Sequence, residues 1–207
     1  RYVRLIRYGA VREFNLSVGH PPGSNITFAR LYLYVSGSHN LQTRKGVIPL
    51  FYITLNTEPL EKDQVYIDTD GDDNRQVAAT YAYDVREQLK GNGTGHLSVR
   101  NLDYEQSVFT IDDVLLVTAY ENETAPSTSY WIDEGCDVIS SLPEKGLFPD
   151  DCKTDYSFSG SVNMSTAGDA FLYLVSTGID HDNTTEHTVR FNDGKWLNLF
   201  DNRSNSL

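Results

Sequence analysis

The sequence is poor in the features that mark several common classes of protein. Seventeen Lys and Arg residues face 29 Asp and Glu, and the resulting net charge of −12 argues against a nucleic-acid partner. The longest apolar runs, such as Val114–Val117 and Ala170–Val175, are too short to cross a bilayer. Hydrophobic residues still make up 39% of the chain, which is enough for a folded core.

Fingerprints of catalysis are also missing. The sequence contains no G-x-S-x-G, P-loop or Rossmann motif, and no pair of histidines has a tight metal-binding spacing. With 29 acidic residues, the sequence alone cannot single out a pair of carboxylates for glycoside hydrolysis. We therefore expect a protein that is not an enzyme.

Sequons for N-glycosylation are abundant. Seven N-x-Ser/Thr triplets occur, none with Pro in the middle, at Asn15, Asn25, Asn92, Asn122, Asn163, Asn183 and Asn202. A sequon matters only in an exported chain, so these triplets predict an extracellular glycoprotein. The chain opens at Arg1 without a signal peptide, which fits a processed product. The alternative is that a polar β-protein is rich in Asn, Ser and Thr in any case.

The two cysteines, Cys136 and Cys152, enclose a short segment that contains Pro and Asp. In an exported chain such a pair predicts one disulfide, which would stabilise the fold by roughly 3 kcal/mol. A bridge between neighbouring chains is left open. A metal pair or two free thiols are less favoured, because there is no C-x-x-C spacing and no His nearby.

Short alternating segments separated by turns dominate the pattern and predict an all-β fold, an antiparallel, jelly-roll-like β-sandwich. One short helix is expected over Asp84–Lys90, and a hairpin at Asp193-Gly194. No repeat or linker divides the chain, so we predict one domain over residues 13–207 after a basic strand over residues 1–12. The expected strands are Tyr2–Tyr8, Glu13–Val18, Asn25–Val35, Val47–Leu55, Gln64–Ile67, Gln76–Val85, His96–Leu102, Val108–Tyr120, Thr128–Asp133, Tyr156–Val162, Phe171–Thr177, His187–Asn192 and Lys195–Phe200.

Charge is concentrated at the N-terminal end. Residues 1–45 carry seven Arg and Lys against a single acid, Glu13, whereas the rest of the chain is strongly acidic. Opposite ends of two copies could attract each other, although the basic residues could equally pair within one fold or face solvent. The first strand could add to a neighbour's sheet or be the first strand of its own sandwich. The residues expected to act in assembly are Arg1, Val3, Arg4, Leu5 and Arg7.

An acidic turn, from Asp68 to Asn74, is a candidate Ca²⁺ site. Alternating carboxylates around a Gly turn can direct hard oxygen ligands at one cation, as in the first half of an EF-hand loop. The later bidentate Glu of that loop is missing, since Ala79 stands there. A solvated acidic turn is the more ordinary interpretation. The candidate ligands are Asp68, Asp70, Asp72 and Asp73.

Five strings resemble a family of secreted archaeal surface proteins, typical of methanogens and classed only as a domain of unknown function. They are Ile26–Val35, Ala79–Val85, Asp113–Tyr120, Tyr130–Asp137 and Phe191–Trp196. Residues 131–137 of the fourth string form W-I-[ND]-E-G-C-D, the most specific piece. The resemblance spans about residues 25–200 and implies an exported, glycosylated, β-rich envelope protein, with no catalytic residues to carry over.

Together these features predict a non-enzymatic structural subunit of an extracellular envelope assembly: a sheath, a surface layer or a filament. We expect copies of the chain to associate with one another, and strand donation is one possible route. Ca²⁺ is the single candidate cofactor. The alternative is a Ca²⁺-dependent carbohydrate-binding module or adhesin. Thirteen Tyr, nine Phe and two Trp could stack on sugar rings, although aromatic residues more often pack within sheets.

Overall fold

The computed structural model describes residues 4–21, 23–69, 77–90, 94–103, 107–124, 126–139, 141, 148, 150–163, 165, 168–177 and 187–199. Contacts within the chain divide it into two compact units. The larger is Val3–Gly168, and the smaller is Asp169–Leu207 together with Arg1–Tyr2. Composition marks no linker at this division, and the sequence predicts a single domain over residues 13–207.

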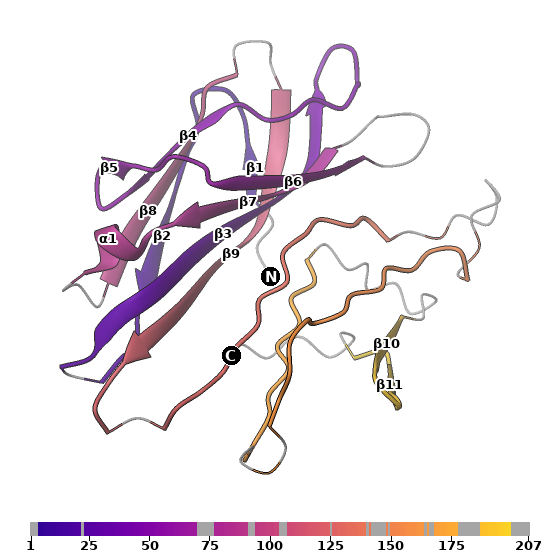
Figure 1. Ribbon diagram of the computed structural model, residues 1–207. Coiled ribbons are helices and arrows are strands. Elements are labelled where there is room, and N and C mark those ends of the chain that lie inside the picture. Colours follow the sequence, from indigo (N-terminus) through magenta and orange to yellow (C-terminus); the bar gives the residue numbers. More distant parts are fainter. Residues whose placement is uncertain are drawn as a thin grey trace. The chain divides into compact units, whose positions relative to one another are not determined.

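The larger unit is a sandwich of two antiparallel sheets (Figure 1). The five-stranded sheet has the order β1 (Arg4–Ile6), β9 (Ser107–Glu121), β3 (Asn25–Asn40), β7 (Val77–Asp84) and β6 (Gln64–Thr69). The four-stranded sheet has the order β2 (Val11–Ser17), β8 (Thr94–Asn101), β4 (Phe51–Leu55) and β5 (Glu58–Pro59). The predicted antiparallel β-sandwich with one short helix is confirmed.

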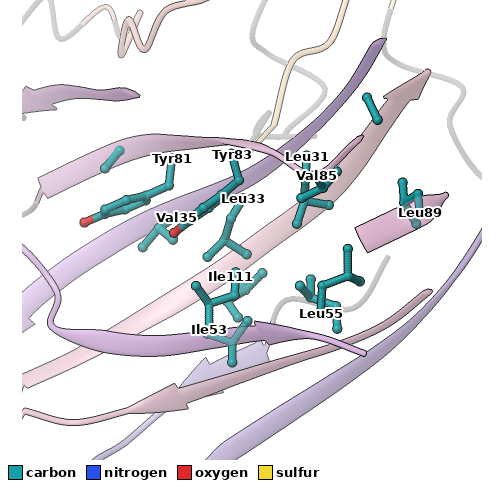
Figure 2. Close-up of a cluster of buried hydrophobic side chains, with 14 of the residues drawn as sticks. Leu31, Leu33, Val35, Ile53, Leu55, Tyr81, Tyr83, Val85, Leu89 and Ile111 are labelled. Atoms are coloured by element: carbon teal, nitrogen blue, oxygen red, sulfur yellow. The ribbon is translucent and has the colours of Figure 1, made fainter. Parts of the chain in front are cut away.

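The core lies between the two sheets and follows from the alternation of side chains along the strands. On β3, Leu31, Leu33 and Val35 are at most 2% exposed and belong to the core cluster. Figure 2 shows them together with Ile53 of β4 and side chains from β7. Successive residues of a strand point to opposite faces, so the intervening polar residues of β3 lie on the outer face of the sheet.

The single helix of the described residues is α1 (Arg86–Leu89), inside the predicted range and too short to span a bilayer. The N-cap residue is Val85, which makes no side-chain capping bond, so the expected cap at Asp84 is wrong. The carboxylate of Asp84 still accepts a hydrogen bond from the backbone N–H of Arg86 at 3.0 Å. Buried Leu89 joins the core cluster, so the helix is also held by an apolar contact.

The smaller unit contains the predicted hairpin, formed by β10 (Thr188–Phe191) and β11 (Gly194–Leu197). Phe191 pairs with Gly194, so the two-residue turn is Asn192-Asp193, and Asn192 takes a positive φ of 50°. Asn tolerates the left-handed conformation that such a turn requires. The strand that we expected to reach from His187 to Asn192 therefore ends one residue earlier.

Three predicted strands are wrong. The ranges 128–133, 156–162 and 171–177 are described without strand structure. Their alternating or apolar patterns satisfy the side-chain rule for a strand, but a strand also needs a neighbouring backbone in register. Two of the three ranges instead make side-chain contacts, with the five-stranded sheet and with each other.

Candidate functional site

A segment that follows β9 lies across the outer face of the five-stranded sheet. We call residues 130–138 the strap; it contains the W-I-D-E-G-C-D string and runs without strand structure (Figure 1). At its start the ring of Tyr130 packs on Phe28 of β3, with centroids 5.7 Å apart. At its other end the backbone N–H of Val138 donates to Asp68 of β6 at 2.7 Å. The strap therefore contacts both β3 and β6.

The centre of the strap is fixed by Glu134. Its carboxylate accepts two hydrogen bonds from Arg30 of β3, Nε to Oε1 at 2.8 Å and Nη2 to Oε2 at 3.0 Å. The hydroxyl of Tyr32 donates to Oε1 at 2.6 Å, and the hydroxyl of Tyr66 on β6 donates to Oε2 at 2.9 Å. Arg30 also donates to Asp63, just before β6. Four hydrogen bonds thus converge on one carboxylate.

The electrostatics of this cluster favour a permanent anion at Glu134. Burial acts to raise the pKa of Glu134, but the hydrogen bonds from Arg30, Tyr32 and Tyr66 outweigh it, and the net pKa is lowered. The hydrogen bond to Glu134 raises the pKa of Arg30. Burial, followed by the hydrogen bond to Glu134, raises the pKa of Tyr32. At neutral pH Glu134 is therefore ionised, Arg30 is charged and Tyr32 is neutral.

The middle strand beneath the strap presents small side chains to it. Thr80 and Ala82 alternate on β7 with the core residues Tyr81 and Tyr83, and both are nearly inaccessible to solvent. Small residues let another backbone approach a sheet closely. The thiol of half-buried Cys136 is hydrogen-bonded to the side chain of Thr80, and burial raises its pKa. Both faces of this part of the sheet are therefore covered.

A second segment, residues 154–160, runs antiparallel to the strap. The side chains of Thr154 and Tyr156 both donate to Asp137, and these bonds lower the pKa of that carboxyl. A Cβ built on Gly160 would lie 2.8 Å from Nε1 of Trp131, so the indole packs directly on the glycine backbone. Gly160 has a φ of 122°, which side-chain-bearing residues rarely adopt.

The predicted disulfide is absent: Cys136 and Cys152 are not bonded in the structure. Asp137, the residue after Cys136, accepts hydrogen bonds from the side chains of Thr154 and Tyr156. A disulfide needs Cα atoms about 4.4–6.8 Å apart with suitably directed Cβ atoms. Closeness in sequence does not impose that geometry.

The candidate Ca²⁺ site is only partly within the described residues. Asp68 lies on β6, where its carboxylate accepts the bond from Val138 of the strap. Asp70, Asp72 and Asp73 fall outside the described residues. In the part of the chain that the structure describes, no three His, Cys, Asp or Glu side chains form a group suited to a metal ion.

The asparagines of four of the seven sequons fall within the described residues, and Met164, in the triplet of Asn163, lies outside them. Asn15, Asn25 and Asn163 are exposed, and Asn122 is half-buried. Asn92, Asn183 and Asn202 lie outside the described residues, so no structural statement applies to them. Every described sequon thus has an asparagine that solvent reaches.

The expected assembly residues lie at or near an edge of the five-stranded sheet. Arg4 and Leu5 belong to β1, which pairs with Ile111 and Thr110 of β9 in the same chain. Arg7 is exposed just after this strand. Arg1 and Val3 fall outside the described residues.

Sequence reasoning missed Glu134 as the centre of a site. Its three direct partners lie on β3 and β6, and Arg30 is separated from it by 104 positions. The one usable signal in the sequence was that Arg30 and Tyr32 alternate with apolar residues along their strand. Such a pattern indicates an outer face that something polar covers, but not which segment covers it.

Comparison with known families supports the resemblance in its coarse form. A family model described as a protein of unknown function (DUF3344) matches residues 7–206. The chain belongs to this family. No curated protein and no solved structure matches the chain. The DUF3344 family model assigns no activity, so the evidence for function lies in the residues themselves.

Proposed function

We propose that this DUF3344 protein is a non-enzymatic, glycosylated structural subunit of an extracellular archaeal envelope assembly, such as a sheath, surface layer or filament. Copies associate with one another by donating the first strand. The observation that carries the proposal is the position of β1 at the edge of the five-stranded sheet, held by three residue pairs with β9.

The connection after β1 suits exchange between copies. β1 belongs to one sheet and β2 to the other, and the turn between them includes Gly9 with a φ of 71°. A change in this turn would redirect β1 while the sandwich stays intact. The edge of β9 left open would accept the β1 strand of a neighbour, with the same backbone hydrogen bonds. Repetition of that step in one direction builds a chain of subunits.

The chemistry of the strap supports a structural role. The carboxylate of Glu134 already accepts four hydrogen bonds, and its pKa is lowered. A general acid needs a raised pKa and access to substrate, and Glu134 has neither property. The cluster is suited to holding the strap against the sheet. A sandwich fastened on its outer face in this way is a rigid building block.

Electron microscopy of native material that carries this chain, prepared without detergent, tests the proposal. We expect regular tubes, sheets or fibres, and dispersed single particles would count against assembly.

A variant lacking residues 1–9 tests strand donation: it should remain folded by circular dichroism yet stay monomeric. A synthetic peptide of residues 1–9 should block assembly of the full chain, whereas a scrambled peptide should not. Polymers formed by the truncated variant would refute donation.

A second candidate function is carbohydrate binding, as an adhesin would show. It rests on Trp131 and Tyr156, which are 41% and 53% exposed and are held by Gly160 and Asp137 respectively. Fixed, exposed aromatic rings can stack on sugars. Binding of a monomer to a glycan array, lost in Trp131→Ala, would favour this function; assembly without glycan binding would favour the first.

A further inference from the structure

The four described sequons divide into two kinds by their hydrogen bonds. In the first kind, the hydroxyl of the third residue donates to the amide oxygen of its own asparagine. Thr124 Oγ1 donates to Asn122 Oδ1 at 2.7 Å, and Ser165 Oγ donates to Asn163 Oδ1 at 2.7 Å. The backbone N–H of the same Thr or Ser donates to the same oxygen, at 2.9 and 3.1 Å. Asn122-Glu123-Thr124 is therefore an Asx turn closed by the hydroxyl, and the same two bonds join Ser165 to Asn163.

In the second kind, either the asparagine oxygen or the hydroxyl has a partner on a neighbouring strand. Asn15 lies in the middle of β2, opposite His96 of β8, and its Oδ1 is 3.1 Å from the ring Nδ1 of that histidine. In the triplet that starts at Asn25, the hydroxyl of Thr27 donates to the carbonyl of Ala119 on β9 at 3.3 Å. The asparagine oxygen of the first triplet thus has a partner on β8, and the hydroxyl of the second has a partner on β9.

The two kinds of sequon also differ in whether their backbone is paired within a sheet. Asn15-Leu16-Ser17 is paired in full with Thr94–His96 of β8. Asn25 and Ile26 are paired with β9, and Ile26 is 5% exposed within the core. The triplet at Asn122, and Asn163 with Ser165, lie outside the strands. A modifying enzyme can bind a turn in its cleft without breaking the hydrogen bonds of a sheet. The triplets on β2 and β3 would first have to separate from the strands that pair with them.

We infer that Asn122 and Asn163 are the preferred N-glycosylation sites of the folded chain, and that Asn15 and Asn25 are modified little or not at all. This inference rests on the proposed function, since only an exported chain meets the transferase. The glycan donor is a lipid-linked oligosaccharide whose anomeric carbon carries a phosphate.

The reaction balances on the asparagine amide. A bond forms between Nδ2 and the anomeric carbon, the bond from that carbon to the phosphate oxygen breaks, and Nδ2 loses one proton to a base. The lipid phosphate leaves with the electron pair. A hydroxyl that donates to Oδ1 draws electron density from the amide and makes its N–H easier to deprotonate. At Asn122 the amide nitrogen also donates to Ser24 Oγ at 3.0 Å, and the hydrogen that remains after modification can keep this bond.

Glycopeptide mapping of the native protein by mass spectrometry tests the inference. We expect glycan on most copies at Asn122 and Asn163 and on few copies at Asn15 and Asn25. In cells that produce the variants, Asn122→Gln and Asn163→Gln should each reduce the intact mass by one glycan. The matched variants Asn15→Gln and Asn25→Gln should leave the number of glycans unchanged. Thr124→Ser, which keeps both the sequon and a hydroxyl, should keep the glycan at Asn122.

Two outcomes would overturn the inference in distinguishable ways. Equal occupancy at all four sites would show that modification precedes folding, and the proposed extracellular function would stand. Protein from cells with no glycan at any of the four would overturn the glycosylated envelope function and this inference with it.

Discussion

Arg30 and Glu134 form a fork of two parallel hydrogen bonds, Nε to Oε1 at 2.8 Å and Nη2 to Oε2 at 3.0 Å. Both side chains are largely buried, at 12% and 15% exposure. A guanidinium matches a carboxylate in this geometry better than an ammonium could. The pair joins β3, the central strand of the five-stranded sheet, to the strap, so its loss should destabilise both.

Replacing Glu134 should destabilise the protein. In Glu134→Ala, Arg30 and two tyrosine hydroxyls lose their acceptor in a largely buried place, which should lower the free energy of unfolding by about 3 kcal/mol. Urea unfolding followed by circular dichroism measures this. Limited proteolysis should also cut within residues 130–138 faster than in the wild type.

Glu87→Ala is the matched control. Glu87 forms an ion pair with Lys90 at 2.6 Å on the surface, and both side chains are more than half exposed. Exposed pairs contribute little to stability, so this variant should unfold like the wild type. Equal effects of the two substitutions would mean that the strap is not fastened by Glu134.

Acid should release the same interaction. The pKa of Glu134 is lowered in the folded state, so its contribution is present above the ordinary glutamate pKa and is lost as pH falls through the folded value. Glu134→Gln mimics the protonated side chain. The stability difference between wild type and Glu134→Gln should therefore be largest at neutral pH and should shrink below about pH 4.

Unfolding curves for both proteins between neutral and acidic pH measure this difference. Asp137, whose pKa is lowered by Thr154 and Tyr156, titrates in both proteins and so cancels in the comparison. A difference that stays constant across the range would show that the charge of Glu134 does not contribute.

Alternation along the chain is enough to predict the sandwich and its core face. Leu31, Leu33 and Val35 occupy every second position of β3, and the structure buries all three. The partner of Arg30 is not predictable in this way, because an outer-face residue can be solvated or covered, and the choice depends on a segment 104 positions away. Periodicity records which face is apolar, not which distant loop returns to it.

The same limit explains the incorrect predictions. Residues 156–162 alternate like a strand, but alternation says nothing about whether a neighbouring backbone is in register. Cys136 and Cys152 are close in sequence, yet they are not bonded in the structure. Local patterns constrain side-chain direction well and long-range register poorly.

Loss of the hydroxyl should change the free energy of unfolding differently at two buried tyrosines. Tyr81 is 3% exposed, and its hydroxyl has no hydrogen-bond partner among the described residues. Its ring packs edge-on against Phe51 at 4.7 Å, a contact that phenylalanine can keep. Tyr81→Phe should therefore be neutral or stabilising by up to about 1 kcal/mol, because a buried unpaired hydroxyl is removed.

Tyr32→Phe is the comparison, since this hydroxyl donates to the charged Glu134 at 2.6 Å. Its removal should cost about 2 kcal/mol. Thermal and urea unfolding of both variants test the pair. A Tyr81→Phe protein that is destabilised as much as Tyr32→Phe would indicate that the Tyr81 hydroxyl has a partner in solution, such as a water molecule.

Gly160 should not tolerate a side chain. Its φ of 122° strains any residue with a Cβ, and that Cβ would lie 2.8 Å from the indole nitrogen of Trp131. Gly160→Ala should lower the free energy of unfolding by about 2 kcal/mol. Gly168→Ala is the control, because a Cβ there meets nothing within 4 Å.

Fluorescence separates a local effect from general destabilisation. The chain has two tryptophans, so Trp196→Phe leaves Trp131 as the sole reporter. In that background Gly160→Ala should shift the emission of the folded protein, because the indole must leave the glycine backbone, whereas Gly168→Ala should not. If Gly160→Ala keeps both stability and emission unchanged, residues 154–160 do not pack on the strap in solution. The contact with Trp131 would then contribute nothing to holding it.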